Sequence, residues 1–270
     1  MTRALLSALF ATAAALAQTA PPHVSYVASI KVNNSVDARG FSEYSPGGRL
    51  AATAITVAQL IRNAYRIQPY QLLGAPAWLS TRRYDVAAKA DGPPYPTQQA
   101  LVRALLEDRF HLAARNEPRD MPIFALVLAR REAKPEGKLG PQLTGSSFDC
   151  AALLASPHAP PEPGRTPNCA TRIGPGTLSG KAISMAQLAA GLSPFAGRFT
   201  VDQTGLSGVF DVELTWTPEQ TPSPDASQAP SGASIFTALQ EQLGLKLTND
   251  RGSVPVLVID HIEEPKESDQ

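Results

Sequence analysis

The chain has 270 residues, and its 24 Lys and Arg residues balance its 24 Asp and Glu residues to a formal net charge of zero. Nucleic-acid-binding proteins present a basic excess or stripe, whereas here Arg82-Arg83 and Arg130-Arg131 are isolated pairs, so we expect no nucleic-acid partner. The length suits one large or two modest domains, and the 25 Pro and 19 Gly residues place much of the chain in loops.

Residues 1–17 have the pattern of a secretory signal peptide. Arg3 supplies a positive charge, residues 4–16 form an apolar run, and Ala15 and Ala17 give the small-x-small cleavage pattern. The apolar run is shorter than the roughly 20 residues that a membrane-spanning helix needs. We therefore expect an exported protein, periplasmic or secreted, that does not span the membrane after signal cleavage. The alternative is a buried N-terminal helix.

The second half of the chain repeats the first. Residues 48–60 match residues 176–188, and the run Tyr84-Asp85-Val86 matches the run Phe210-Asp211-Val212. Self-similarity on this scale indicates one folded unit used twice. We therefore expect the two runs to occupy equivalent elements of two repeats.

A first α+β repeat is predicted over residues 24–131. A turn signal at residues 45–48 predicts a hairpin. Hydrophobic periodicity then predicts helices that begin after Thr56 and Thr97, and strands over residues 84–90, 110–115 and 123–128.

A second repeat is predicted over residues 176–264, with its hairpin turn at residues 174–176. Helices are expected over residues 185–192 and 235–243, and strands over residues 209–216 and 254–259. The fold class is therefore α+β, a tandem internal repeat of helix-strand-strand units whose helices pack on largely antiparallel sheets.

The repeats are joined by residues 132–175, which are rich in Pro and Gly and predict an irregular linker. Residues 217–234 contain almost nothing apolar, so we expect a disordered insertion there. The only two cysteines, Cys150 and Cys169, lie in the linker. In an oxidising compartment they predict a disulfide, worth about 3 kcal/mol for a loop of this length.

No motif for phosphate binding, nucleophilic catalysis or metal binding is complete. The run at residues 174–181 does not fit a phosphate-binding loop, because Pro175 stands where the first Gly is needed and Ala182 stands where the final Ser or Thr is needed. Val209 stands where a nucleophile elbow around Ser207 needs Gly. The histidines show none of the paired spacings of a zinc site; they are His23, His111, His158 and His261. We therefore expect no metal and no cofactor.

Two sets of residues are candidates for function. Asp85 and Asp211 are equivalent in the repeat, and a paired-carboxylate active site is one interpretation. The other is that each carboxylate accepts hydrogen bonds from a neighbouring turn or pairs with a local Arg, which fixes the strand entrance. Trp and Arg are enriched in binding hot spots, so the weaker binding candidates are Tyr65, Trp78, Arg82 and Arg83. Core packing of Trp78 is the competing interpretation.

Motifs along nearly the whole mature chain resemble a known family. They are V-A-S-I-K-x-N-N, P-G-G-R-L, A-P-A-W-L-S-x-x-R-Y-D-V, L-L-x-D-R-F-x-L, D-x-T-G-L-S-G-x-F-D and L-V-I-D-H-I-E-x-P. Together they are similar to a family of exported proteins of unknown function that is expanded in acidobacterial genomes. Related domains on sensor-like metallopeptidases imply sensing or partner binding. The helix-strand-strand units also look loosely like the short N-terminal domains of secretins and TonB-dependent receptors.

These observations favour an exported binding or sensing module that recognises a protein or cell-envelope ligand and has no catalytic activity. Its expected partner is an envelope protein or a sensor. The alternatives are a hydrolase that uses Asp85 and Asp211 as paired carboxylates, and a purely structural envelope protein.

Overall fold

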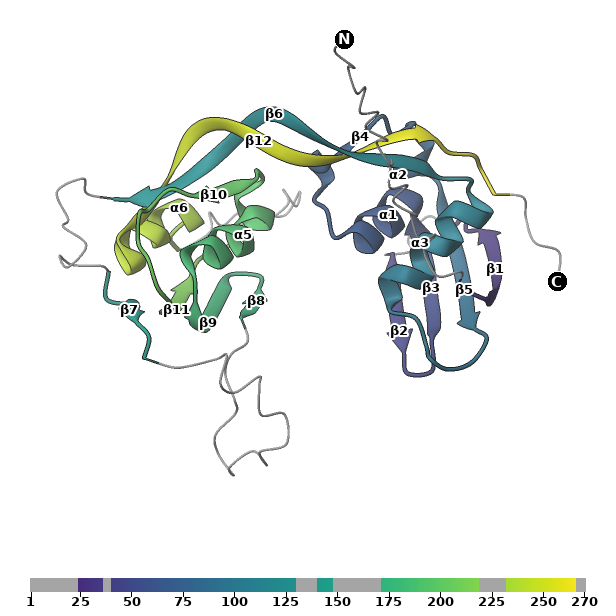
Figure 1. Ribbon diagram of the computed structural model, residues 1–270, viewed down its shortest axis with the longest axis horizontal. Coiled ribbons are helices and arrows are strands. Elements are labelled where there is room, and N and C mark those ends of the chain that lie inside the picture. The colour runs from purple at the N-terminus through teal and green to yellow at the C-terminus, as the bar shows by residue number, and fades with distance from the viewer. Residues whose placement is uncertain (1–23, 36–39, 130–139, 148–170, 219–231, 266–270) are drawn as a thin grey trace, which may run out of the picture. The chain divides into compact units, whose positions relative to one another are not determined.

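The computed structural model describes residues 24–35, 40–129, 140–147, 171–218 and 232–265. The chain divides into two compact units (Figure 1). Unit 1 comprises residues 1–65, 76–112 and 261–270, and unit 2 comprises residues 66–75 and 113–260. The predicted signal peptide and the predicted disulfide between Cys150 and Cys169 lie outside the described residues.

Unit 1 is a four-stranded antiparallel sheet with helices on one face. Its strands are β1 (Tyr26–Val32), β2 (Phe41–Ser45), β3 (Arg49–Thr56) and β5 (Arg83–Ala90), in the order β1-β5-β3-β2. Its helices are α1 (Val57–Tyr65), α2 (Trp78–Thr81) and α3 (Gln98–Arg109).

Alternation along β5 shows which face of this sheet the helices cover. Tyr84, Val86 and Ala88 are buried, whereas Ala87 and Lys89 are exposed. Because successive side chains of a strand point to opposite faces, the buried set faces the helices. The exposed set lies on the opposite face, which we call the open face of unit 1.

Unit 2 contains a second four-stranded antiparallel sheet. Its strands are β7 (Leu143–Gly145), β8 (Arg172–Gly174), β9 (Thr177–Ile183) and β11 (Phe210–Thr215), in the order β7-β11-β9-β8. Its helices are α5 (Met185–Ala196) and α6 (Ile235–Ala238), and α6 continues as the π-helical turn η2 (Leu239–Leu243). The core between them contains Leu178, Leu188, Val212, Leu214 and Leu239.

A third sheet, also in unit 2, is built on two long strands. These are β6 (Ala113–Leu128) and β12 (Leu245–His261), which lie side by side as a ribbon (Figure 1). The short strands β10 (Thr200–Asp202) and β4 (Leu72–Leu73) pair in parallel with β6 and β12, respectively. The 3-10 turn η1 (Pro69–Gln71) precedes β4, and the Gln71 side chain donates a hydrogen bond to the Pro255 carbonyl at 2.8 Å.

Side-chain caps explain why the main helices begin where they do. Before α1, the Thr56 N–H donates to Gln59 Oε1 at 3.0 Å and the Gln59 N–H donates to Thr56 Oγ1 at 3.2 Å. Ser184 and Gln187 form the same reciprocal cap before α5. Such boxes satisfy two backbone donors that the first turn leaves free, so the predicted helix starts are confirmed.

The α+β class is confirmed, with several antiparallel sheets and few helices. One predicted strand start is wrong, because residues 110–112 end helix α3 and β6 begins only at Ala113. His111 adopts a left-handed backbone (φ 51°), and the Leu112 N–H returns to the Leu106 carbonyl at 3.0 Å. This geometry closes the helix in the manner of a left-handed C-terminal cap.

The predicted irregular linker is wrong at both of its described ends. Residues 143–145 form β7, which pairs with β11, and residues 172–174 form β8, which pairs with β9. The side chain of Leu143 is buried in the core of unit 2. A three-residue strand with one buried side chain leaves no periodic signal in the sequence.

The predicted disordered insertion also begins and ends in ordered structure. The Thr217 N–H donates to the Ala233 carbonyl at 2.9 Å, and the Ser234 hydroxyl accepts from the Thr237 N–H at 3.3 Å as the cap of α6. The prediction is therefore wrong at these margins. Its centre, residues 219–231, lies outside the described residues.

Candidate functional site

Asp85 and Asp211 each hold a kink in the neighbouring strand. Asp85 Oδ1 accepts from the Ala54 N–H at 2.9 Å and from the Asn33 side chain at 2.7 Å. Asp211 Oδ1 accepts from the Ala182 N–H at 3.1 Å. Ala54 and Ala182 have φ values of 49° and 51°, and the strand register shifts beside each of them. Each carboxylate therefore satisfies the backbone of a left-handed alanine at a β-bulge.

Unit 2 adds a cation to this arrangement. Lys181 Nζ donates to Asp211 Oδ2 at 2.7 Å. Partial burial raises the pKa of the Asp211 carboxyl, but the hydrogen bonds from Lys181, Ser146 and the Ala182 N–H outweigh it, so the pKa lies below its ordinary value. In unit 1 the corresponding bulge is held by Arg83, whose guanidinium donates to the Ala54 carbonyl at 3.0 Å. These are the contacts expected from the second interpretation of Asp85 and Asp211, in which each carboxylate is engaged by its immediate neighbours rather than by a substrate.

The four predicted binding residues all lie in unit 1, each in its own local contact. Tyr65 lies 4.6 Å beneath the guanidinium of Arg103, and Arg82 forms an ion pair with Glu264. Trp78 is half-buried at the start of α2. The Arg82 N–H donates to the Trp78 carbonyl at 2.9 Å, which closes α2. Among the described residues, no side-chain hydrogen bond or ion pair joins the four to one another, and they stay a prediction.

The open face of unit 1 carries a hollow of about 570 Å³. Its lining includes Val27, Arg49, Ala51, Ala87 and Lys89. In the strand register, Val27, Lys89 and Arg49 lie in one row across β1, β5 and β3, and Ala87 and Ala51 lie directly opposite each other in the next row. The floor is therefore made of alanine methyl groups, and two cations line one side.

Two large apolar side chains are also exposed on this face. Val27 is 61% exposed and Phe41 is 60% exposed. Phe41 shares its face with Ser45, a lining residue of the hollow, because the two are an even number of positions apart on β2. Exposed apolar surface of this kind is typical of interaction sites when it is contiguous and has a polar rim.

The antiparallel sheet β7-β11-β9-β8 of unit 2, which we call the second sheet, has a different open face. Its hollow, about 250 Å³, is lined by charged and polar side chains that include Arg172, Ser179, Lys181, Asp211 and Glu213. Opposite charges are already paired there, since Lys181 is bound to Asp211. This face therefore offers a smaller and more polar surface than the open face of unit 1.

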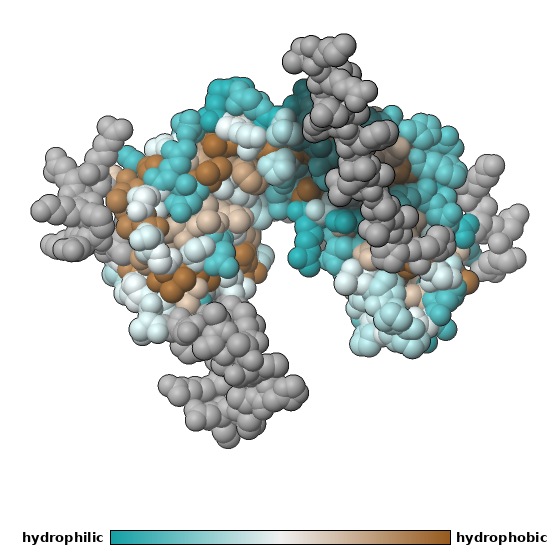
Figure 2. Space-filling view, in the orientation of Figure 1, coloured by the Kyte–Doolittle hydropathy of each residue, from teal (hydrophilic) through white to brown (hydrophobic). Residues whose placement is uncertain are grey.

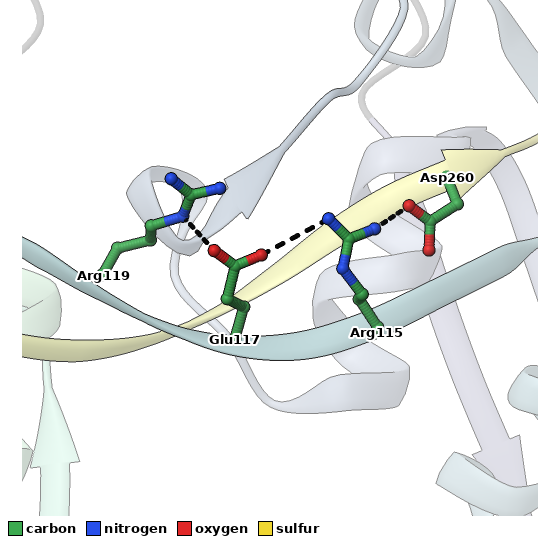
Figure 3. Close-up of polar contacts among 4 residues, drawn as sticks. All are labelled: Arg115, Glu117, Arg119 and Asp260. Atoms are coloured by element: carbon green, nitrogen blue, oxygen red, sulfur yellow. Dashed lines mark hydrogen bonds and ion pairs between the residues drawn. The ribbon is translucent and has the colours of Figure 1, made fainter.

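The β6–β12 ribbon carries a ladder of charges. Arg115 pairs with Asp260 and with Glu117, and Glu117 also pairs with Arg119 (Figure 3). Hydrophilic residues predominate along this ribbon in the face shown by Figure 2. Exposed ion pairs contribute little to stability, and all four side chains are satisfied by one another, so the ladder offers no free group for a ligand.

Two classes of site are not found among the described residues. They contain no group of three or more His, Cys, Asp or Glu side chains that could hold a metal ion. No helix in the described ranges is long and apolar enough to cross a bilayer.

The residues of the open face were missed at the level of sequence. Arg49 and Ala51 alternate with buried Leu50 and Ala52, and Ala87 and Lys89 alternate with buried Val86 and Ala88. This period of two was a usable signal for an exposed face. The pairing that brings Arg49 opposite Lys89 depends on the register of β3 with β5, which the bulge at Ala54 shifts.

A family model described as "Protein of unknown function (DUF3738)" matches residues 58–262. The chain therefore belongs to the DUF3738 family, which confirms the expectation of an unknown-function family. The acidobacterial expansion of that family stays a prediction. No curated protein and no solved structure matches the chain.

Proposed function

We propose that this DUF3738 protein is an exported binding module, without catalytic activity, and that it receives a partner protein on the open face of unit 1. One observation carries the proposal. A hollow of about 570 Å³ with an alanine floor lies on a sheet face that no helix of unit 1 covers, and Val27 on its edge is 61% exposed. Exposed apolar side chains beside a hollow with a polar rim are typical of an interaction site.

The sequence pattern of residues 1–17 supports export. The local contacts of Asp85 and Asp211 support a non-catalytic role, because each carboxylate is engaged with the backbone of its own bulge. The hydrolase and the purely structural envelope protein remain the alternatives.

We also propose that the two antiparallel sheets derive from one repeated unit. The strand orders β1-β5-β3-β2 and β7-β11-β9-β8 correspond strand by strand. The matching runs Ala58-Gln59-Leu60 and Ala186-Gln187-Leu188 both lie in the helix that follows the second hairpin strand. Least-squares superposition of an experimental structure tests this, and a poor fit of α1 on α5 would contradict it.

The binding proposal is tested by exchanging one residue between the two faces. Ala87 lies opposite Ala51, and Glu213 lies opposite Ser179 at the same place in the second sheet. The exported chain is immobilised and offered envelope extract, as the wild type and as the variants Ala87→Glu and Glu213→Ala. We expect wild type and Glu213→Ala to retain the same partner and Ala87→Glu to lose it. Retention of that partner by a folded Ala87→Glu variant would refute the assignment of the face.

A further inference from the structure

The open face of unit 1 carries two cations that nothing in the fold requires. Arg49 and Lys89 are directly opposite each other on β3 and β5. Neither forms an ion pair with another described residue. Like charges directly opposite each other on neighbouring strands destabilise a sheet, so this pair carries a cost that no contact within the described structure offsets.

The surroundings of the pair define what would offset that cost. Val27 lies beside Lys89 on β1, Ser45 lies beside Arg49 on β2, and the next row holds Ala87 and Ala51. The nearest acidic side chain across β2, Glu43, is opposite Ala51 rather than Arg49. A ligand that satisfies this site therefore presents carboxylates to the cations and small apolar groups to the alanine floor. A guanidinium accepts a carboxylate through two parallel hydrogen bonds.

The second sheet shows that this strand arrangement does not require a pair of cations. In its equivalent positions Thr177 lies opposite Thr215, and Ser179 lies opposite Glu213. The same strand order is thus built with neutral residues where unit 1 has Arg49 and Lys89.

We infer that the partner segment received by the open face of unit 1 is an acidic peptide with interspersed apolar residues. The inference rests on the proposed function and adds the chemical class of the partner. It commits to a protein segment rather than a lipid surface, because adsorption to anionic membranes takes clusters of about four to eight basic residues. On this face the Arg83 guanidinium is bound to the Ala54 carbonyl, and Lys31 lies opposite Asp85. Arg49 and Lys89 are therefore the two cations left for a ligand among the described residues of this face, which also carries Glu43.

The test begins with an unbiased selection. A phage library of random 12-residue peptides is selected on the full exported chain, and one selected peptide is synthesised with a fluorophore for anisotropy titration. We expect the selected sequences to be enriched in Asp and Glu beside apolar residues. Replacing the acidic residues of the chosen peptide by Asn and Gln should weaken its binding at least tenfold.

Three variants of the protein locate the effect. The double variant Arg49→Thr with Lys89→Thr copies the second sheet and should bind the acidic peptide at least tenfold more weakly. Lys89→Glu places an opposite charge across from Arg49, so it should raise the melting temperature while it abolishes peptide binding. The matched control, Thr177→Arg with Thr215→Lys in unit 2, should leave the affinity unchanged within twofold.

The outcomes separate this inference from the proposed function. Selected peptides without acidic enrichment, whose binding Ala87→Glu still abolishes, would overturn the inference and leave the face as a binding surface. Peptide binding that survives both Ala87→Glu and the Arg49→Thr, Lys89→Thr double variant would overturn both. Cosedimentation with phosphatidylglycerol vesicles, or self-association, that requires Arg49 and Lys89 in the absence of any peptide binding would also overturn the inference.

Discussion

The antiparallel sheet of unit 1 and the second sheet share a frame but differ in their open faces. Both have a bulge at a left-handed alanine held by an aspartate, Ala54 with Asp85 and Ala182 with Asp211. Both have a glycine with positive φ in the hairpin turn, Gly48 and Gly176, whose carbonyl oxygen accepts a backbone hydrogen bond at 2.9 Å. On one open face the hollow has an alanine floor beside Arg49 and Lys89, which form no ion pair with a described residue, and on the other the hollow is charged and contains the Lys181–Asp211 ion pair.

The difference teaches which residues the frame constrains. The shared residues satisfy backbone groups or allow a backbone angle that L side chains rarely adopt. The residues that differ, such as Ala87 and Glu213, project away from the core and touch no backbone group that needs them. An open face can therefore change its chemistry while the fold stays the same, which is where we expect function to reside.

The largest expected effects come from core leucines, one in each unit. Leu60 is 1% exposed and Leu188 is fully buried. Replacing either by Ala removes methyl groups and leaves a cavity, which costs about 2–5 kcal/mol of unfolding free energy. The two tryptophans report on the units separately, since Trp78 lies in unit 1 and Trp216 in unit 2.

Urea unfolding followed by fluorescence, in Trp78→Phe and Trp216→Phe backgrounds, measures this effect. Leu60→Ala should shift the transition seen by Trp78, and Leu188→Ala the transition seen by Trp216. Equal shifts of both transitions by either variant would show that the two units unfold as one, so the stability of each unit could not be compared separately.

The bulge aspartates should give the next largest effect. Asp85→Ala leaves the N–H of fully buried Ala54 without an acceptor, at a cost of about 1–3 kcal/mol. Asp211→Ala should cost less, because Ala182 is only half-buried. Asparagine keeps the Oδ1 acceptor, so Asp85→Asn should retain most of the stability in the same urea assay. A hydrolase would instead lose its activity in the asparagine variant while keeping its fold, and such a result would favour the enzyme alternative.

The ion pair at the second bulge predicts a pH dependence in unit 2. The pKa of Asp211 is lowered in the fold, so its contribution is present above the unfolded value of about 3.9 and is lost as pH falls through the folded pKa. Trp216 fluorescence in urea, measured between pH 6 and pH 3, should show this loss, and Lys181→Met should flatten it. If the unfolding free energy of Lys181→Met fell with pH as steeply as that of the wild type, the Lys181–Asp211 ion pair would not be what distinguishes the bulge of unit 2 from that of unit 1.

The smallest effect is expected where the two faces differ. Ala87→Glu and Glu213→Ala change exposed side chains on open faces, so each should alter the unfolding free energy by no more than about 0.5 kcal/mol. Thermal melting of both variants checks this. If either variant lowered the melting temperature by several degrees, the substituted residue would be one that the fold requires, and the open faces could not be separated from the rest of the fold.

Local signals in the sequence were sufficient for the elements that they predicted well. Thr56, Thr97 and Ser184 start helices because each side-chain oxygen satisfies a backbone donor of the first turn. The turn glycines Gly48 and Gly176 mark the hairpins, because only a residue tolerant of positive φ fits there. These are interactions between residues a few positions apart, so the sequence states them directly.

Long-range pairing explains what the sequence could not predict. β7 and β8 have three residues each, and they exist because β11 and β9 offer free edges. The parallel pairs β10 with β6 and β4 with β12 join segments far apart in the chain. Nothing in a short strand specifies its partner, since the partner is decided by the whole sheet.

The candidate site divides in the same way. By itself the sequence determined the α+β class and the principal helices and strands, because periodicity is carried by residue order. Its self-similarity predicts the equivalence of Asp85 with Asp211. Only the tertiary structure decided that these carboxylates satisfy bulges and that Arg49 faces Lys89. The physical reason is strand register, which sets side chains from distant segments opposite one another and which a one-residue bulge alters.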